Sequence, residues 1–196
     1  EEMAEFMDVL GGNFYTSFPG VEFGLNVFDA PVSATGINLD FLHSIAPNKP
    51  LGNYAFHPHS LPPRSLWRRA PEGYAYALIW HCFLHGMRFC TFWLWEMGWP
   101  YRGAPEVNCS AFPEVAGDIG RAALDLRRLA EFVCQFPPEG TKVGLLLPRL
   151  SVFLDRGLFY KVSKVYRALD FIGAPAKFVT ERTMGRGALD GLKVLV

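Results

Sequence analysis

With 196 residues, the chain is long enough for one large domain or two small ones. Half of the residues are apolar and 15% are aromatic, which supports a substantial core and excludes a disordered chain. Nineteen basic residues balance nineteen acidic ones without any basic run, so charge gives no reason to propose nucleic acid as a partner. The longest apolar run, 74–99, is interrupted by His81, His85, Arg88 and Glu96, which argues against a membrane span.

The four cysteines lack the spacing of a zinc or thioredoxin motif, because no Cys-x-x-Cys pair occurs. Cys82 and Cys90 lie in apolar segments, and we predict buried thiols rather than disulfides. Thiols, together with the absence of a signal peptide, favour a reducing, cytoplasmic location. The first residue is not methionine and the last segment, "GLKVLV", is strand-like, so we expect a fragment of a longer protein.

The first part of the chain alternates helices with strands. The predicted order is the end of a helix at 1–7, a strand at 8–18, a loop to about Gly36, a short helix at 37–47, a strand at 50–56, a helix at 71–87 that begins at Pro71, and a buried strand at 88–97. Such alternation predicts parallel strands with crossover helices. It is compatible with a (β/α)8 barrel, whose active site lies at the carboxyl ends of the strands.

The second part of the chain has a different order of predicted helices and strands. A long amphipathic helix at 112–136 is followed by turn-forming residues at 137–141. Then come a strand at 142–147, a helix at 158–172 and strands at 176–182 and 192–196. We predict a boundary near residue 138, with one α/β unit at 1–138 and a second at 139–196.

Three predicted strand ends carry polar and aromatic side chains that suit a sugar. The candidates are Tyr15 on the first, Asn53, Ala55 and His57 on the second, and Trp95 and Glu96 on the third. Positions 53, 55 and 57 share a parity and should point to one face of the strand. Glycoside hydrolysis needs two carboxylates, and only Glu96 in this set is acidic.

The same residues could instead have purely structural roles, in the core, in a loop or in an ion pair. Tyr15 and Trp95 could be core aromatics, and His57 could be a loop residue. Glu96 could instead pair with an arginine such as Arg64, Arg68 or Arg102.

His81 and His85 stand one helical turn apart and could bind a metal. Because no acidic third ligand is near them in the sequence, we favour helix packing and predict no metal site. No cofactor fingerprint is found, and none is expected.

Residues 8–133 resemble the last third of the barrel of family 42 glycoside hydrolases, the beta-galactosidase type. The similar segments are "GNFYTSF", "LDFLHSIAPNKPLGNYAFHPHS", "YALIWHCFLHGMRFCTFWLWE" and "DIGRAALDLRRLAEFV". In that family the strand after a Lys-Pro pair carries the nucleophile, in a pattern close to Asn-x-Glu-aromatic-His. Here the pattern reads Asn53-Tyr54-Ala55-Phe56-His57, with Ala55 in place of the glutamate.

The resemblance implies a parent that hydrolyses β-galactosides or similar glycosides with retention. The general acid/base would lie on an earlier strand outside this chain, and the chain as given would be inactive. Either Ala55 was substituted to trap a ligand, or the parent is a natural pseudoenzyme, or the register is off by a residue or two. Residues 142–196 similarly resemble the start of the flavodoxin-like domain through which these enzymes form trimers.

Two further hypotheses stay open. One is a pseudoenzyme that binds carbohydrate without cleaving it. The other is an assembly segment, in which the amphipathic helix and the second unit make oligomer contacts without any sugar.

Overall fold

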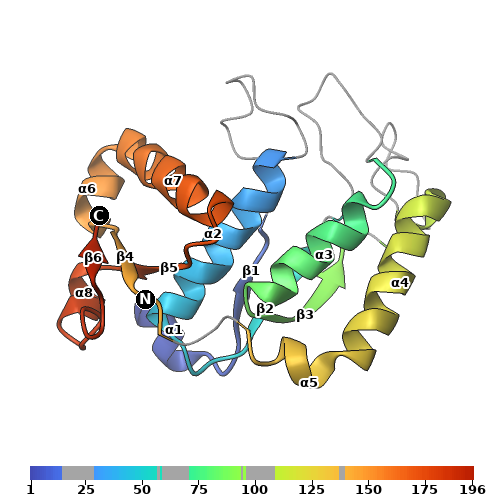
Figure 1. The fold of residues 1–196 in the computed structure, drawn as a ribbon, viewed down its shortest axis with the longest axis horizontal. Helices are drawn as coiled ribbons and strands as arrows, with labels where there is room; N and C mark the ends of the chain where they lie inside the picture. Colours follow the sequence, from blue (N-terminus) through green and yellow to red (C-terminus); the bar gives the residue numbers. More distant parts are fainter. Residues whose placement is uncertain (15–28, 57, 59–70, 94, 96–108, 137–139) are drawn as a thin grey trace.

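The described strands form two parallel sheets of three strands each (Figure 1). This computed structural model describes residues 1–14, 29–56, 58, 71–93, 95, 109–136 and 140–196. The first sheet has the order β1 (Leu10–Gly12), β2 (Leu51–Phe56), β3 (Met87–Phe92). The second has the order β5 (Ala176–Val179), β4 (Val143–Leu146), β6 (Val194–Leu195). All four strand pairings are parallel, which confirms the predicted α/β class.

Helices surround and connect the two sheets. They are α1 (Glu2–Phe6), α2 (Asp29–Ile45), α3 (Tyr74–Leu84), α4 (Pro113–Arg128), α5 (Ala130–Val133), α6 (Arg149–Leu154), α7 (Arg156–Phe171) and α8 (Glu181–Met184), with a 3-10 turn at Cys109–Ala111. Figure 1 shows α2 in the middle of the molecule, between α3 and α7. One side of α2 adds Leu39 to the core of the first sheet, and another adds Ile37 to the core of the second.

Helix α2 begins eight residues before the predicted helix, within a segment that we predicted to be a loop. Pro31 falls in its first turn, where the missing N–H breaks no intrahelical hydrogen bond. Gly36 is in the helix because two elements approach it closely. A Cβ at this position would lie 2.8 Å from Nε2 of His81 on α3 and 3.1 Å from the hydroxyl of Tyr166 on α7.

The Lys-Pro pair before β2 contributes to the first sheet. The ammonium of Lys49 donates hydrogen bonds to the carbonyls of Ala4 and Met7, each at 2.6 Å. These carbonyls are at the end of α1, where a helix has acceptors without intrahelical partners and favours a positive charge. Lys49 therefore holds the end of α1 next to the start of β2. The next residue, Pro50, accepts a backbone hydrogen bond from Leu10 of β1.

Other element boundaries also differ from the sequence prediction. The helix predicted from Pro71 begins at Tyr74, because Pro71 starts a tight turn that ends in Gly73, whose φ is +80°. The strand predicted at 88–97 ends at Phe92. The long amphipathic helix is interrupted at Leu129, between α4 and α5.

Ionic contacts connect α1 to the second sheet. The carboxylate of Glu1 pairs with Arg149, and Glu5 pairs with Arg182 and Arg186. These arginines hold the pKa of Glu5 below its usual value. The contacts of Glu5 are partly exposed to solvent, so their contribution to stability is small.

The cysteines agree with the prediction of thiols. None of the four, all of which lie in described ranges, forms a disulfide. Cys82 and Cys109 are buried and Cys134 is exposed. Burial raises the pKa of Cys90 to about 12, which makes this thiol unreactive. Among the described helices, none combines the length and apolarity that crossing a membrane would require.

Candidate functional site

The predicted sugar site falls at one edge of the first sheet. Because β1, β2 and β3 are parallel, their carboxyl ends meet at this edge. Strand β2 is the central strand, and it carries Asn53 and Ala55 near its end. Both side chains are buried, with 0% and 5% exposure, whereas Tyr54 between them is exposed.

A register shift lies within this part of β2. Asn53 is opposite Cys90 and Phe56 is opposite Phe92, so three residue steps on β2 face two on β3. The N–H of Ala55 donates to Oδ1 of Asn53 at 3.1 Å. Such bulges re-aim side chains and are frequent beside active sites. Asn53 and Ala55 are both buried with Tyr54 exposed between them, as the alternation predicted, but Phe56 is buried as well; His57 lies outside the described residues.

Asn53 has a polar group available for a ligand. Its Nδ2 is fully buried and finds no hydrogen-bond acceptor within the described part of the chain. A buried donor without an acceptor costs about 1–3 kcal/mol. An oxygen of a bound molecule would satisfy it.

Aromatic side chains follow the third strand. Trp93 and Trp95 come after the end of β3, although the strand was predicted to continue to residue 97, and each is about half exposed at 50% and 49%. The N–H of Trp93 donates to the carbonyl of Phe56 at 2.9 Å, which brings this segment beside the end of β2. The predicted residues Tyr15, His57 and Glu96 lie outside the described residues, so their contacts with Asn53, Ala55 and Trp95 stay a prediction.

A second polar cluster lies where α2, α3 and α7 meet. Asp40 of α2 accepts hydrogen bonds from Tyr166 of α7 at 2.7 Å and from Nδ1 of His85, which follows α3, at 2.8 Å. Asp170 of α7 places a carboxylate oxygen 3.9 Å from Nε2 of His85. His81 stacks obliquely on His85, with ring centroids 4.3 Å apart.

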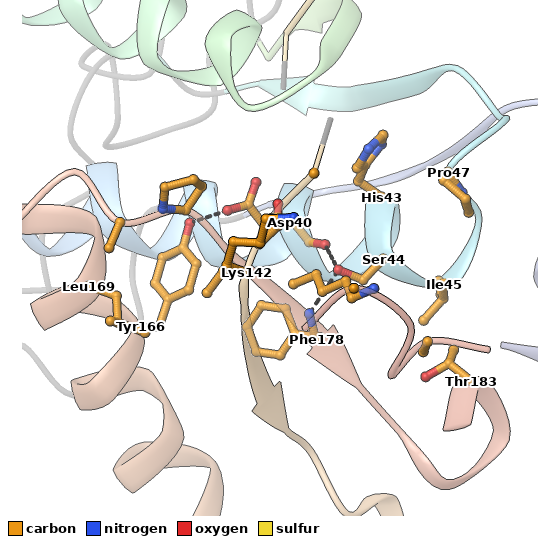
Figure 2. A pocket seen from close by; sticks show the side chains of 18 of the residues that line it. Asp40, His43, Ser44, Ile45, Pro47, Lys142, Tyr166, Leu169, Phe178 and Thr183 are labelled. Carbon is orange, nitrogen blue, oxygen red and sulfur yellow. Dashed lines mark hydrogen bonds between the residues drawn. The ribbon is translucent and has the colours of Figure 1, made fainter. Parts of the chain in front are cut away.

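The cluster borders a cavity of about 830 Å³, which is lined by the C-terminal parts of α2, α3 and α7 and by residues around β5 and α8. Figure 2 shows the hydroxyl of Tyr166 reaching Asp40, and Ser44 bridging to the backbone N–H of Phe178 on β5. Asp40, His85, Tyr166 and Asp170 all line this cavity. No local motif in the sequence marks this cluster, because Asp40 is on α2 whereas Tyr166 and Asp170 are on α7, more than 100 residues away.

Burial and nearby charge shift the pKa values of the two histidines in opposite directions. Burial lowers the pKa of His81 to about 3, so its imidazole is neutral. Burial also disfavours the charged form of His85, but the hydrogen bond and charge of Asp40 outweigh it and raise the pKa of His85. Burial and the like charge of Asp40 raise the pKa of Asp170, although His85 opposes this shift.

The hydrogen bond from Tyr166 to Asp40 gives a stability prediction. Tyr166 is 2% exposed, and its O–H donates to a carboxylate. Such a bond contributes about 1.5–3 kcal/mol, so Tyr166→Phe is expected to lower the free energy of unfolding in urea by roughly that amount. The control is Tyr54→Phe, whose exposed hydroxyl lies 3.4 Å from the Val9 carbonyl and which should change stability by less than about 0.5 kcal/mol. Equal effects of the two substitutions would contradict the prediction.

Comparison with solved structures identifies the fold. The chain aligns with the beta-galactosidase of Rahnella sp. R3 at a TM-score of 0.73 and 16% identity, over 99% of this chain and 29% of that one. It aligns with a catalytic mutant of the GH42 beta-galactosidase Gan42B of G. stearothermophilus at 0.68 and 13%, over 92% and 28%. The GH42 exo-carrageenase of Bacteroides ovatus gives 0.63 and 21%, over 80% and 21%.

The fold is therefore that of part of a GH42 glycosidase. The chain spans between 21% and 29% of the length of these structures. No family model matches the sequence, and no curated protein matches it significantly.

Proposed function

We propose that this chain forms the last strands and helices of a retaining glycoside hydrolase barrel at 1–138, followed by the start of a flavodoxin-like domain at 139–196. The expected substrates are β-galactosides or similar glycosides. One observation carries the proposal. The stretch Asn53-Tyr54-Ala55-Phe56 of the motif occupies the end of the central strand of a parallel sheet, in a fold similar to that of GH42 enzymes.

Ala55 stands at the proposed nucleophile position. A retaining glycosidase uses a carboxylate there to attack the anomeric carbon, and a methyl group cannot do so. The general acid/base would lie on a part of the barrel outside this chain. We infer that the chain as given binds sugar without cleaving it efficiently. A natural pseudoenzyme would behave in the same way.

The features of the strand edge support binding of a sugar. Asn53 has a buried amide donor with no acceptor among the described residues. Trp95 offers a half-exposed ring, which can pack on the apolar face of a pyranose. Tyr15, His57 and Glu96 complete the proposed site.

Chemical rescue tests the proposal. The substrate is an aryl β-galactoside, given to the full-length polypeptide that carries this sequence, with Ala55 in place. Azide can enter the space left by the absent carboxylate, attack the anomeric carbon and release the phenolate. Azide-dependent turnover with a glycosyl azide product would support Ala55 as the nucleophile position. Full turnover without azide would contradict it. Binding of sugar without turnover in either condition would favour the pseudoenzyme.

A further observation favours the assembly hypothesis for the second unit. Large apolar side chains on one face of α6 are strongly exposed, namely Leu150, Phe153 and Leu154. A patch of this kind is typical of a protein contact surface. We infer that it contacts a second copy of the chain, in line with the trimeric parent that the sequence resemblance implies.

This contact predicts self-association of the chain. In sedimentation velocity the average mass should rise with concentration, and Phe153→Ser should reduce that rise because it removes an 83% exposed ring from the patch. The control is Leu124→Ser, which removes a 70% exposed side chain from α4 and should leave the association unchanged. A monomer at all concentrations would contradict the inference.

A further inference from the structure

The two histidines of α3 acquire a third potential ligand from α7. His81 and His85 are four residues apart and lie on one side of α3 and its C-cap. Asp170 is 85 residues further along the chain, and its carboxylate oxygen lies 3.9 Å from Nε2 of His85. One ligand atom from each of the three residues lies within 4.8 Å of the others.

The hydrogen bonds leave one nitrogen of each ring available. Nδ1 of His85 is held by Asp40 at 2.8 Å, so its Nε2 is the nitrogen that faces Asp170. The backbone of Val32 accepts a hydrogen bond from His81. Nε2 of His81 is buried and has no partner in the part of the chain that the structure describes, so Nδ1 must be the donor. Metal-binding histidines are typically oriented in this way, with the second ring nitrogen donating to a carboxylate or a backbone carbonyl.

We propose that His81, His85 and Asp170 bind one divalent transition-metal ion of the zinc type, and that Asp40 positions His85 for it. Two imidazoles and one carboxylate suit zinc, which accepts nitrogen and oxygen ligands in tetrahedral geometry. They do not suit calcium or magnesium, which prefer oxygen ligands. Three protein ligands leave a fourth position, and the cavity lined by His85 and Asp170 can supply water to it.

The three ligand atoms, which lie within 4.8 Å of one another, must move closer together to bind one ion. Tetrahedral zinc with bonds of about 2.0–2.2 Å places its ligand atoms roughly 3.3–3.5 Å apart. The observed 3.9 Å from His85 to Asp170 is close to this value. The Asp170 side chain is 34% exposed, so it can rotate toward the histidines. A dication would also offset the mutual repulsion of the Asp40 and Asp170 carboxylates.

The site would join the two halves of the molecule. His81 and His85 belong to the helix that precedes β3, and Asp170 to the helix that precedes β5. Gly36 of α2 leaves room beside it, since a Cβ there would lie 2.8 Å from Nε2 of His81 and 3.4 Å from Cε1 of His85. The alternative is a protonated His85 held between two carboxylates without any ion. That arrangement provides no partner for Nε2 of His81.

Titration of the metal-free, untagged chain with Co²⁺ tests the proposal. Tetrahedral Co²⁺ absorbs in the visible range, and Zn²⁺ added afterwards should displace it. The exposed Cys134 is replaced by serine in every variant, to remove a competing thiol. The expected result is one ion per chain, with binding in the micromolar range or tighter.

His81→Leu and Asp170→Asn should each weaken binding by at least ~100-fold, because each removes a direct ligand. Asp40→Asn should weaken it by about 10–100-fold, as loss of an orienting partner does.

Two matched controls come from the same cavity. His43→Gln and Asp190→Asn alter residues that line the cavity but are not among the three proposed ligands, and they should bind as the parent does. If His81→Leu fails to fold, as judged by circular dichroism, Asp170→Asn decides the outcome by itself. Absence of Co²⁺ binding, or unchanged affinity in Asp170→Asn, would overturn the proposal.

Discussion

Ala55→Glu is expected to convert the full-length polypeptide that carries this sequence into an active β-galactosidase. The new carboxylate would attack the anomeric carbon and form a glycosyl-enzyme intermediate, which water then hydrolyses with net retention. Deleting the nucleophile of a well-studied hydrolase costs about 10⁶-fold in turnover. We therefore expect release of nitrophenol from an aryl β-galactoside to increase by ~10⁴-fold or more over the Ala55 protein.

The site around position 55 makes this substitution informative. Ala55 is 5% exposed and lies beside the buried Nδ2 of Asn53, which has no acceptor among the described residues. A glutamate that reaches a functional site would be hydrated or hydrogen-bonded there. One that points into the core would be a buried, unpaired charge and would destabilise the fold by several kcal/mol.

Ala55→Gln is the matched control, because it has the same size and no nucleophilic carboxylate. It should fold as Ala55→Glu does and remain inactive without azide. An inactive Ala55→Glu protein with a strongly reduced free energy of unfolding would mean that the nucleophile belongs at another position. An inactive variant that folds normally and binds galactose would favour the pseudoenzyme.

Gly11→Ala is expected to have the largest effect on stability. A Cβ on Gly11 of β1 would lie 2.2 Å from the backbone oxygen of Gly52 on β2, the residue paired with it. Because this contact is with backbone, only separation of the two strands can relieve it. We expect a loss of about 3 kcal/mol or more in the free energy of unfolding, measured in urea.

Gly117→Ala is the control for this substitution. Gly117 is exposed within α4, and no described atom lies within 4 Å of a Cβ built on it. Alanine is favoured over glycine inside a helix, so this variant should gain about 0.5–1 kcal/mol. If Gly11→Ala were equally well tolerated, the close pairing of β1 with β2 would be incorrect.

The proposed metal site and the proposed glycosidase site are independent. His81, His85 and Asp170 lie between α3 and α7, whereas Ala55 lies at the end of β2. Failure of metal binding would leave the nucleophile assignment unchanged. Failure of Ala55→Glu would likewise leave the metal proposal unchanged.

The sequence by itself determined the class of fold and the position of the central strand. Alternation of predicted helices with predicted strands indicated parallel strands, and β2 lies at 51–56 where a strand was expected at 50–56. This succeeded because strand and helix periodicity are local properties. The same local signals misplaced the start of α2, since Pro31 and Gly36 usually indicate a loop.

Only the tertiary structure decided which distant side chains meet. His81 and His85 were visible as a pair, but Asp170 joins them solely because α7 packs near α2 and α3. The shift in register after Asn53 depends on how β3 pairs with β2, so parity could not reveal it. Such contacts arise from packing between elements far apart in the chain, and no periodicity within one element records them.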